Sequence, residues 1–512
     1  MSELLSMKNI TKRYGNGLLA NEDASFSLRE GEIHAIAGEN GAGKSTLMKI
    51  LFGAEQPTSG VIELRGKPVK IASPKVATSL GIGMVYQHFM LVDELPVYLN
   101  VFLGVEKRKG LLLDKQAMID ETRRLCETYD MPVDPLALCG DLPVGLRQKV
   151  EILKVLARDQ SLAGSAKIII LDEPTAVLTP QETEQLFKQL RILRDANHTI
   201  VIITHKLKEM KELCDRITIM RQGKTMGVVN VCDVTEQQIS ELMVGGTVRL
   251  KVDKADVTPG EVVAEMKAVT VPSAGKPKLD SVSLTARAGE ILCLAGVEGN
   301  GQQQAIECLT GQIAYQGSVT VLGEEVRGKS IRKIRDLGMA HIPEDRMTMG
   351  TDQKASLHEN LISVDFDRNT VAGFLKDKAL KARSEQQLVD FLVKGERQTP
   401  ISMLSGGNMQ KVVVARELTK GAKLIIANQP TRGVDVGAIA FIHEKLVELR
   451  DQGCGIILVS ADMSEVFSLA DRIIVFHEGH IAAEITDVAN CSEQQLGRYM
   501  LGIDRMEAKQ RI

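Results

Sequence analysis

The sequence has no apolar run long enough to cross a membrane. Its longest apolar runs, around residues 168–171, 200–203 and 456–459, have the length of a β-strand, whereas a spanning helix needs about 20 apolar residues. The first five residues also lack a basic segment followed by an apolar stretch, which predicts no signal peptide. We therefore expect a chain that does not enter a membrane by itself.

Two further absences exclude classes of partner and cofactor. The formal net charge is −3, from 63 Lys and Arg against 66 Asp and Glu, so the basic excess of a nucleic-acid-binding domain is missing. None of the eight cysteines forms a CxxC pair or clusters with histidine, which argues against a zinc site. We expect these cysteines to be reduced thiols.

The sequence is a tandem repeat. Its 512 residues suggest two or more domains, and landmarks recur at an offset of 256 to 258 residues. The recurring pairs are Gly38 with Gly296, Gln87 with Glu344, and Pro174 with Pro430. So long a period indicates two duplicated domains. We predict a first domain at 1–247, a linker at 248–260, a second domain at 261–505 and a tail at 506–512.

Each half alternates short β-branched runs with amphipathic stretches, which predicts an α/β fold around a mainly parallel sheet. Strands are expected at 32–37, 166–171 and 199–203, and a helix at 44–52. Polar or charged residues follow these strands, at the sheet edge where ligands bind in such folds.

A complete phosphate-binding loop follows the first predicted strand. It consists of Gly38, Glu39, Asn40, Gly41, Ala42, Gly43, Lys44, Ser45 and Thr46. Glycines let backbone N–H groups converge on phosphate at the start of a helix. Lys44 is predicted to reach the terminal phosphates and Ser45 to bind Mg²⁺.

The corresponding loop of the second half keeps only the glycines. Gly296, Gly299 and Gly301 remain, but Gln302 and Gln303 stand where Lys44 and Ser45 stand in the first half. The chemistry of phosphate hydrolysis is therefore expected in the first half alone.

Two adjacent carboxylates, Asp172 and Glu173, follow the buried run at 168–171. At the end of a strand in a phosphate-loop domain, we expect Asp172 to face the metal and Glu173 to act on the attacking water. Asn428 and Gln429 occupy the corresponding positions of the second half.

The segment 404–411, Leu-Ser-Gly-Gly-Asn-Met-Gln-Lys, resembles the signature peptide of ABC-type ATPases. With the loop and the carboxylates, this resemblance covers nearly the whole chain. It implies two ABC nucleotide-binding cassettes, each with a helical subdomain, that hold ATP between the phosphate loop of one and the signature of the other. It further implies a metal-binding role for Gln87, a γ-phosphate switch role for His205, and adenine stacking by Tyr14.

The resemblance predicts one competent composite site. The first cassette's loop, Asp172, Glu173 and His205 are completed by Ser405, Gly406 and Gly407. In the other site Ala461 replaces the histidine, Glu344 replaces the glutamine, and the signature reads Pro143-Val144-Gly145. Because proline lacks a hydroxyl and a backbone donor, hydrolysis there is expected to be negligible, although its glycines can still hold a nucleotide.

The pattern is similar to that of tandem-cassette ATPase subunits of bacterial importers for simple sugars and nucleosides. The segments 342–346 and 430–437 are typical of that group, while 84–92 and 299–302 favour its nucleoside members. The resemblance implies ATP and Mg²⁺ as cofactors, two membrane permeases and an extracytoplasmic solute-binding protein as partners, and a peripheral place on the cytoplasmic face of the membrane. Contacts with the permeases are expected within 87–141 and 344–403.

Three other classes fit less well. Ribosome-acting tandem ATPases usually keep both sites competent and have a long basic helical linker, neither of which is present. Related DNA-repair ATPases need zinc-spaced cysteines. A purely regulatory nucleotide-binding scaffold does not require Glu173 and His205.

Overall fold

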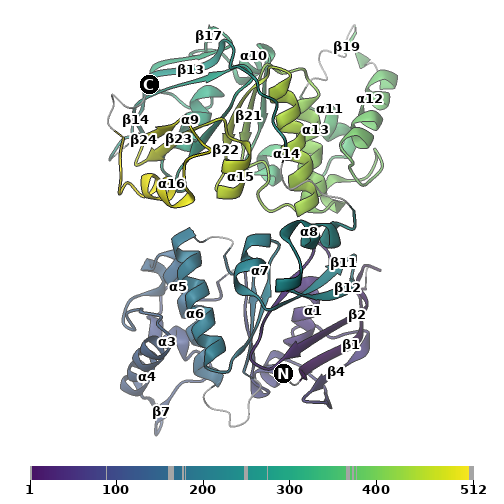
Figure 1. Cartoon of the computed structure of the whole chain (residues 1–512), viewed down its shortest axis with the longest axis vertical. Coiled ribbons are helices and arrows are strands. Elements are labelled where there is room, and N and C mark those ends of the chain that lie inside the picture. The colour runs from purple at the N-terminus through teal and green to yellow at the C-terminus, as the bar shows by residue number, and fades with distance from the viewer. Residues whose placement is uncertain are drawn as a thin grey trace. The chain divides into compact units, whose positions relative to one another are not determined.

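The computed structural model describes residues 3–15, 17–87, 89–159, 167–175, 178, 180–246, 252–273, 275–364, 370–371, 374–375 and 377–506. The chain forms two compact units, Met1–Val248 and Arg249–Ile512. The described residues of each contain a six-stranded sheet, a four-stranded sheet and a two-stranded hairpin (Figure 1). Parts of the predicted linker at 248–260 and of the tail at 506–512 lie outside the described residues.

Among the described residues of the first unit, the central sheet has six strands in the order β12-β11-β3-β10-β9-β6. All neighbours are parallel except the edge pair β11–β12. The strands are β3 Ile33–Ala37, β6 Ile82–Val85, β9 Ile168–Asp172, β10 Thr199–Ile203, β11 Arg216–Arg221 and β12 Lys224–Asn230. Strands β3, β9 and β10 are buried throughout, as expected for a parallel sheet covered on both faces.

A second, antiparallel sheet of the first unit has the order β2-β1-β4-β5. Its strands are β1 Glu3–Arg13, β2 Leu19–Arg29, β4 Ser59–Leu64 and β5 Lys67–Val69. The helices are α1 Lys44–Leu51, α2 Pro74–Ser79, α3 Val97–Val101, α4 Lys115–Thr128, α5 Val144–Asp159, α6 Pro180–Asp195, α7 Leu207–Leu213 and α8 Glu236–Val244, with a hairpin β7 Arg108–Lys109 and β8 Leu112–Leu113. Helix α1 packs Leu47, Ile50 and Leu51 into a core shared by both sheets.

The second unit repeats this topology strand for strand. Its described central sheet has the order β18-β21-β22-β15-β23-β24, again parallel except at the β23–β24 edge. The strands are β15 Ile291–Ala295, β18 Met339–Ile342, β21 Leu424–Asn428, β22 Gly455–Val459, β23 Arg472–His477 and β24 His480–Ile485. The shared order confirms the predicted α/β class with mainly parallel core sheets.

The remaining elements of the second unit also correspond to those of the first. Its antiparallel sheet contains β13 Val262–Val271, β14 Leu279–Arg287, β16 Gln316–Val321 and β17 Glu324–Glu325, and a hairpin contains β19 Thr370–Val371 and β20 Phe374–Leu375. Its helices are α9 Gln302–Leu309, α10 Ile331–Asp336, α11 Leu357–Ile362, α12 Asp377–Asp390, α13 Gly406–Leu418, α14 Val436–Asp451, α15 Met463–Leu469 and α16 Glu493–Met500.

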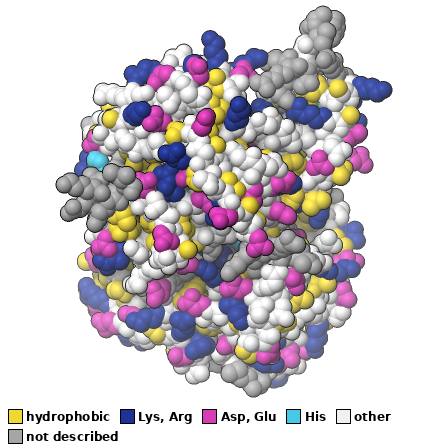
Figure 2. All heavy atoms as spheres, turned by 45° about the horizontal axis from the view of Figure 1, so that its top comes forward, with side chains coloured by type: hydrophobic (Ala, Val, Ile, Leu, Met, Phe, Trp, Pro, Cys, Tyr) yellow, Lys and Arg dark blue, Asp and Glu magenta, His cyan; other side chains and the backbone are white. Residues whose placement is uncertain are grey.

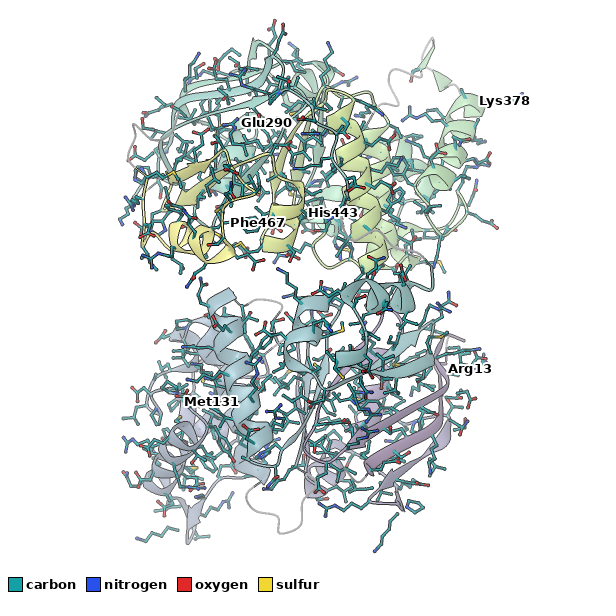
Figure 3. The ribbon with its side chains drawn as sticks, in the orientation of Figure 1. Arg13, Met131, Glu290, Lys378, His443 and Phe467 are labelled. Atoms are coloured by element: carbon teal, nitrogen blue, oxygen red, sulfur yellow. The ribbon has the colours of Figure 1, made fainter. Side chains whose placement is uncertain are left out.

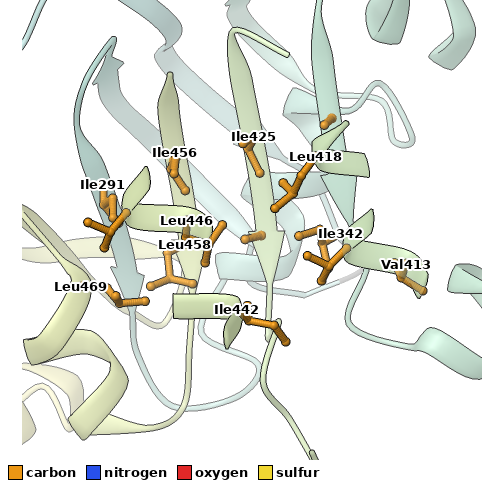
Figure 4. Close-up of a cluster of buried hydrophobic side chains, with 14 of the residues drawn as sticks. Ile291, Ile342, Val413, Leu418, Ile425, Ile442, Leu446, Ile456, Leu458 and Leu469 are labelled. Carbon is orange, nitrogen blue, oxygen red and sulfur yellow. The ribbon is translucent and has the colours of Figure 1, made fainter. Parts of the chain in front are cut away.

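One face of the second unit's central sheet carries a core cluster shared with helices α13, α14 and α15 (Figure 4). Ile425 and Ile456 of the strands meet Leu418 of α13 and Leu446 of α14 in this cluster. Each such side chain stabilises the folded state by about 1.5–3 kcal/mol when it is fully buried. The packing fixes the helices that begin beside the sheet's carboxyl edge.

A buried ion pair recurs at the start of the central strand of both units. Arg216 Nη1 lies 3.1 Å from Glu32 Oε1 in the first unit, and Arg472 Nε lies 2.7 Å from Glu290 Oε1 in the second. Glu290 is labelled in Figure 3. The repeated pair is a structural sign of duplication that the sequence landmarks did not include.

On the face shown in Figure 2, Lys and Arg side chains alternate with Asp and Glu, and hydrophobic side chains occur in small groups. The described helices include none that is long and apolar enough to span a bilayer. All eight cysteines are free thiols.

Candidate active site

Strand order brings the predicted site residues of the first unit together. Asp172 pairs with Ile203 across β9 and β10, and Ile203 pairs with Ile36 across β10 and β3. Parallel strands end at a common edge, so the residues that follow these three strands are neighbours. The loop after β3, the carboxylates at the end of β9 and His205 after β10 therefore meet at one edge.

The loop of the first unit turns from β3 into α1, which begins at Lys44. It holds Gly38, Glu39, Asn40, Gly41, Ala42 and Gly43, and α1 continues with Ser45 and Thr46. Gly43 has a φ of 92°, and a Cβ there would lie 2.4 Å from the carbonyl oxygen of Ala20. Only glycine fits this turn, and the first N–H groups of α1 face the loop as an anion site.

Lys44 is nearly buried, with 7% of its surface exposed. Its Nζ donates to the carbonyl oxygens of Gly38 at 2.7 Å and Glu39 at 2.9 Å. The ammonium is thereby held over the loop, where a phosphate group would meet it.

Ser45 and Asp172 form a hydroxyl–carboxylate pair. Ser45 Oγ donates to Asp172 Oδ1 at 3.3 Å. Burial raises the pKa of Asp172, and the neighbouring charge of Glu173 raises it further. A buried carboxylate beside a hydroxyl is an oxygen donor set of the kind that Mg²⁺ prefers, so these residues fit that ion.

Glu173 lies at the centre of a second cluster. Its Oε1 lies 3.0 Å from His205 Nδ1, and its Oε2 accepts from Gln87 Nε2 at 3.1 Å. The hydrogen bond with His205 lowers the pKa of Glu173 and outweighs the effect of burial. The backbone of Glu173 is left-handed, with φ 47°, and strain of this kind concentrates at functional sites.

Tyr14 is brought together with two charged residues. Lys12 Nζ lies 4.9 Å from the centre of its ring, and its hydroxyl lies 3.5 Å from Glu55 Oε1. Lys12 and Glu55 are themselves 2.8 Å apart. The predicted stacking role of Tyr14 stays a prediction.

The loop of the second unit has the same backbone shape. The φ values are 159°, 83° and 92° at Gly38, Gly41 and Gly43, and 156°, 91° and 118° at Gly296, Gly299 and Gly301. Helix α9 begins at Gln302, as α1 begins at Lys44. The second unit has therefore lost the phosphate-binding side chains of the loop and has kept its backbone shape.

Neutral amides replace the hydroxyl–carboxylate pair in the second unit. Asn428 Nδ2 donates to Gln303 Oε1 at 2.7 Å, in the positions of Asp172 and Ser45. Gln302 Nε2 donates to the carbonyl oxygen of Val297 at 3.4 Å. This hydrogen bond was not predicted from the sequence. The sequence did contain a sign of it, because amide side chains replace both Asp172 and Ser45 in the second half.

The residues around Gln429 also lack acid–base chemistry. Gln429 repeats the left-handed turn of Glu173, with φ 51°, and its Oε1 accepts from the backbone N–H of Ala461 at 3.2 Å. Glu344, in the position of Gln87, forms an ion pair with Arg432 instead. Gln429 and Ala461, at the positions of Glu173 and His205, offer neither a carboxylate nor an imidazole.

The signature of the second unit begins α13. Ser405 is its N-cap, and its Oγ lies 3.0 Å from Asn408 Nδ2. A Cβ on Gly407 would lie 2.4 Å from Asp435 Oδ2, and one on Gly406 would lie 2.9 Å from Arg346 Nη2. The contacts with Arg346 and Asp435 were not predicted from the sequence.

The signature of the first unit has a different start. Pro143 precedes α5, and a Cβ on Gly145 would lie 2.3 Å from Glu182 Oε1. Pro143 has neither a side-chain hydroxyl nor a backbone N–H to offer. Of the two signatures, only the one at Ser405 has a capping hydroxyl.

Replacing Asp172 by Asn is expected to raise the unfolding temperature of the metal-free protein at neutral pH by about 2–4 °C. The raised pKa means that the ionised carboxyl destabilises the fold. This cost is complete above the folded pKa and disappears as the pH falls below the ordinary value of 3.8. Calorimetry in EDTA should show the difference shrinking towards acid pH.

The exposed Asp256 provides the matched control, because its replacement by Asn relieves no burial. A lower unfolding temperature for D172N at neutral pH would show that the Ser45 contact outweighs the cost of burying the charge.

Comparison with known proteins agrees with this geometry. The model of the family described as ABC transporter matches residues 21–176 and 279–432, which is more than half of the chain and one match in each unit. The two matches span both phosphate loops and both strands that carry Asp172 and Asn428.

Full-length relatives carry related names. The nucleoside import ATP-binding protein NupA of Lactococcus lactis subsp. cremoris is 40% identical over 98% of this chain and 98% of its own length. The guanosine import ATP-binding protein NupO of Bacillus subtilis is 40% identical over 99% of both. The glucose import ATP-binding protein TsgD13 of Haloferax volcanii is 39% identical over 97% of this chain and 96% of its own.

A solved complex of archaeal ribosomal stalk protein aP1 and the ribosome recycling factor aABCE1 shares the fold. It has a TM-score of 0.64 and 16% identity, and covers 98% of this chain and 94% of the matched chain. At this identity the likeness shows the fold alone. From the family match and the full-length relatives, the chain belongs to the ABC transporter family, whose ATP-binding domains are ATPases that couple hydrolysis to transport.

Proposed function

We propose that this chain is the ATP-hydrolysing subunit of a bacterial importer and drives uptake of a small polar solute, with nucleosides favoured over simple sugars. One observation carries the ATPase assignment: Glu173 contacts both His205 and Gln87 within the first unit. A carboxylate held ionised beside an imidazole is suited to orient and deprotonate an attacking water. The full-length relatives, all named import ATP-binding proteins, support import.

ATP is proposed to bind at a composite site. Its first part is the loop at 38–46 with Asp172, Glu173 and His205, and its second part is the signature Ser405, Gly406 and Gly407. Ser45, Asp172 and Gln87 would hold Mg²⁺, which neutralises phosphate charge when bound, and Tyr14 would stack on adenine. The cassettes would be residues 1–247 and 261–505, joined by a linker at 248–260 and followed by a tail at 506–512.

The other composite site is proposed to be catalytically silent. Its loop, with Gly296, Gly299 and Gly301, keeps a shape that accepts an anion. Its chemistry is replaced by amides at Gln302, Gln303, Asn428 and Gln429, by Ala461, and by the signature at Pro143 and Gly145. Losing one preorganised donor costs about 10²–10³ in rate, and here several are lost together.

The partners would be two integral-membrane permeases and an extracytoplasmic solute-binding protein. The chain would reach the cytoplasmic face of the membrane only through the permeases. The helical segments between β6 and α5, and between β18 and α13, are the proposed contact regions.

The cargo is tested by uptake of radiolabelled solutes in cells that lack this chain and in cells complemented with it. Uptake of labelled nucleosides is expected to fall to background in the deletion strain and to return on complementation, while labelled ribose uptake is unchanged. Loss of ribose uptake alone would refute the nucleoside assignment. Loss of neither, tested across a panel of nucleosides and sugars, would refute import.

A further inference from the structure

Arg346 binds the loop that leads into α14. It lies at the start of a π-helical turn, Arg346–Gly350, which follows β18. Its Nη1 donates to the carbonyl oxygen of Arg432 at 2.6 Å, and its Nη2 donates to that of Gly433 at 3.2 Å. A planar guanidinium can satisfy two such acceptors at once, which a lysine ammonium cannot do with the same geometry.

The same guanidinium lies against the signature. A Cβ on Gly406 would be 2.9 Å from Arg346 Nη2 and 3.3 Å from the Gly433 carbonyl oxygen. A Cβ on Gly407 would be 2.4 Å from Asp435 Oδ2, and Asp435 caps α14 by accepting from the backbone N–H of Ala438 at 2.9 Å. Helices α13 and α14 then pack into one core. Both signature glycines therefore rest on a surface built by Arg346 and residues 433–435.

A second arginine also joins the loop after β18 to the loop before α14, and this arginine lies on the other of the two loops. Arg432, whose carbonyl Arg346 binds, forms an ion pair through its own side chain with Glu344. Loop 344–346 and loop 432–433 are thus held by two reciprocal contacts. The two contacts connect the end of β18 to the loop that leads into α14.

The first unit uses the corresponding loop differently. There Gln87, at the position of Glu344, donates to Glu173 at 3.1 Å. In the second unit the residue at the position of Glu173 is Gln429, which instead binds the backbone of Ala461. The loop after β18 has therefore exchanged a contact with its own unit's hydrolytic position for contacts with the loop at 432–433, beside which the signature glycines lie.

We propose that Arg346 is a positioning residue for ATP hydrolysis, holding Ser405, Gly406 and Gly407 in the geometry that meets the nucleotide bound by the first unit. This inference rests on the proposed composite site. The degenerate unit thereby retains a function in turnover through its signature, while its own phosphate loop takes no part in the reaction. Arg346 acts through the signature and touches no reacting atom.

Replacing Arg346 by Ala is expected to lower kcat for ATP about 10- to 100-fold, because small displacements of positioning groups have effects of this size. Equilibrium binding of ATP to the first unit's loop, measured with a fluorescent analogue, should change less than about 3-fold, because the loop residues are untouched. Arg346→Lys should recover part of kcat. Arg327→Ala is the matched control, since Arg327 also donates to a carbonyl, that of Gly317, and covers the Tyr315 ring.

A double-mutant cycle with Ser405→Ala separates the possible failures. If Arg346 acts through the signature, adding R346A to S405A should lower kcat less than about 2-fold further. Full additivity, or an unchanged kcat in R346A beside a strong S405A effect, would overturn the positioning role alone. An unchanged kcat in S405A would refute the composite site and the inference with it. Thermal unfolding of each variant, with the partial recovery in R346K, distinguishes lost positioning from a lost fold.

Discussion

Replacing Glu173 by Gln is expected to lower ATP turnover by about 10²–10⁴-fold, the range that general base catalysis contributes. Glutamine has the shape of glutamate and can still accept a hydrogen bond from Gln87. It cannot take a proton from water at neutral pH. Phosphate release at saturating ATP and magnesium measures the loss directly, and nucleotide binding should persist because the loop at 38–46 is unaltered.

Glu63 is a suitable control position for this substitution. It is a carboxylate of the same unit whose partner, Lys8, lies 2.7 Å away on the antiparallel sheet. Glu63→Gln removes an exposed ion pair of small energetic value and should leave turnover within about 2-fold. Turnover near the wild-type rate in E173Q would show that another group handles the proton of the attacking water.

Much of the central sheet could be predicted from sequence because its strands are near-continuous apolar runs. The prediction at 199–203 coincides with β10, that at 32–37 exceeds β3 by one residue, and that at 166–171 overlaps β9 at 168–172. The predicted helix at 44–52 exceeds α1 by one residue. Glycine or polar residues flank these elements, and such residues mark where a strand or helix begins and ends.

Contacts between distant segments could not be predicted in the same way. Gln87 meets Glu173 because β6 and β9 pair in parallel with Val85 opposite Leu171, and this pairing depends on strand order. The Arg346 contacts depend on the turn after β21 and on the start of α14. To predict the amide pair of Gln303 and Asn428, one must know that the residues after β15 and those at the end of β21 face each other.

The structure also shows how a neutral pair can suit a silent site. In the first unit, burying the ionised Asp172 is unfavourable, as its raised pKa indicates. A buried carboxylate that lacks a full partner attracts a cation, because the cation offsets the cost of burying the charge. In the second unit the Asn428–Gln303 hydrogen bond buries no charge. Amides at both positions therefore keep the sheet edge hydrogen-bonded without burying a charge.

Removing the lysine from the first phosphate loop should abolish most turnover, whereas adding a lysine to the second loop should have no effect. Lys44→Ala is expected to reduce turnover by about 10²–10³-fold, because it removes a preorganised cation from the terminal phosphates. Gln302→Lys is expected to fold normally and to add no measurable turnover. A lysine at 302 would find the carbonyl oxygens of Gly296 and Val297, which correspond to the carbonyls that Lys44 binds.

The decisive variant combines both changes. If the second site lacked only its lysine, K44A with Q302K would recover activity, since a competent loop would again be present. The structure argues otherwise. The Asn428–Gln303 amide pair would still replace Asp172 and Ser45, and Gln429 would still bind Ala461 where Glu173 meets His205. Turnover of the double variant should equal that of K44A alone, measured as steady-state phosphate release beside calorimetric confirmation of folding. A clear gain from Q302K, in either background, would show that the second site kept hidden hydrolytic capacity and that its silence depends on a single side chain.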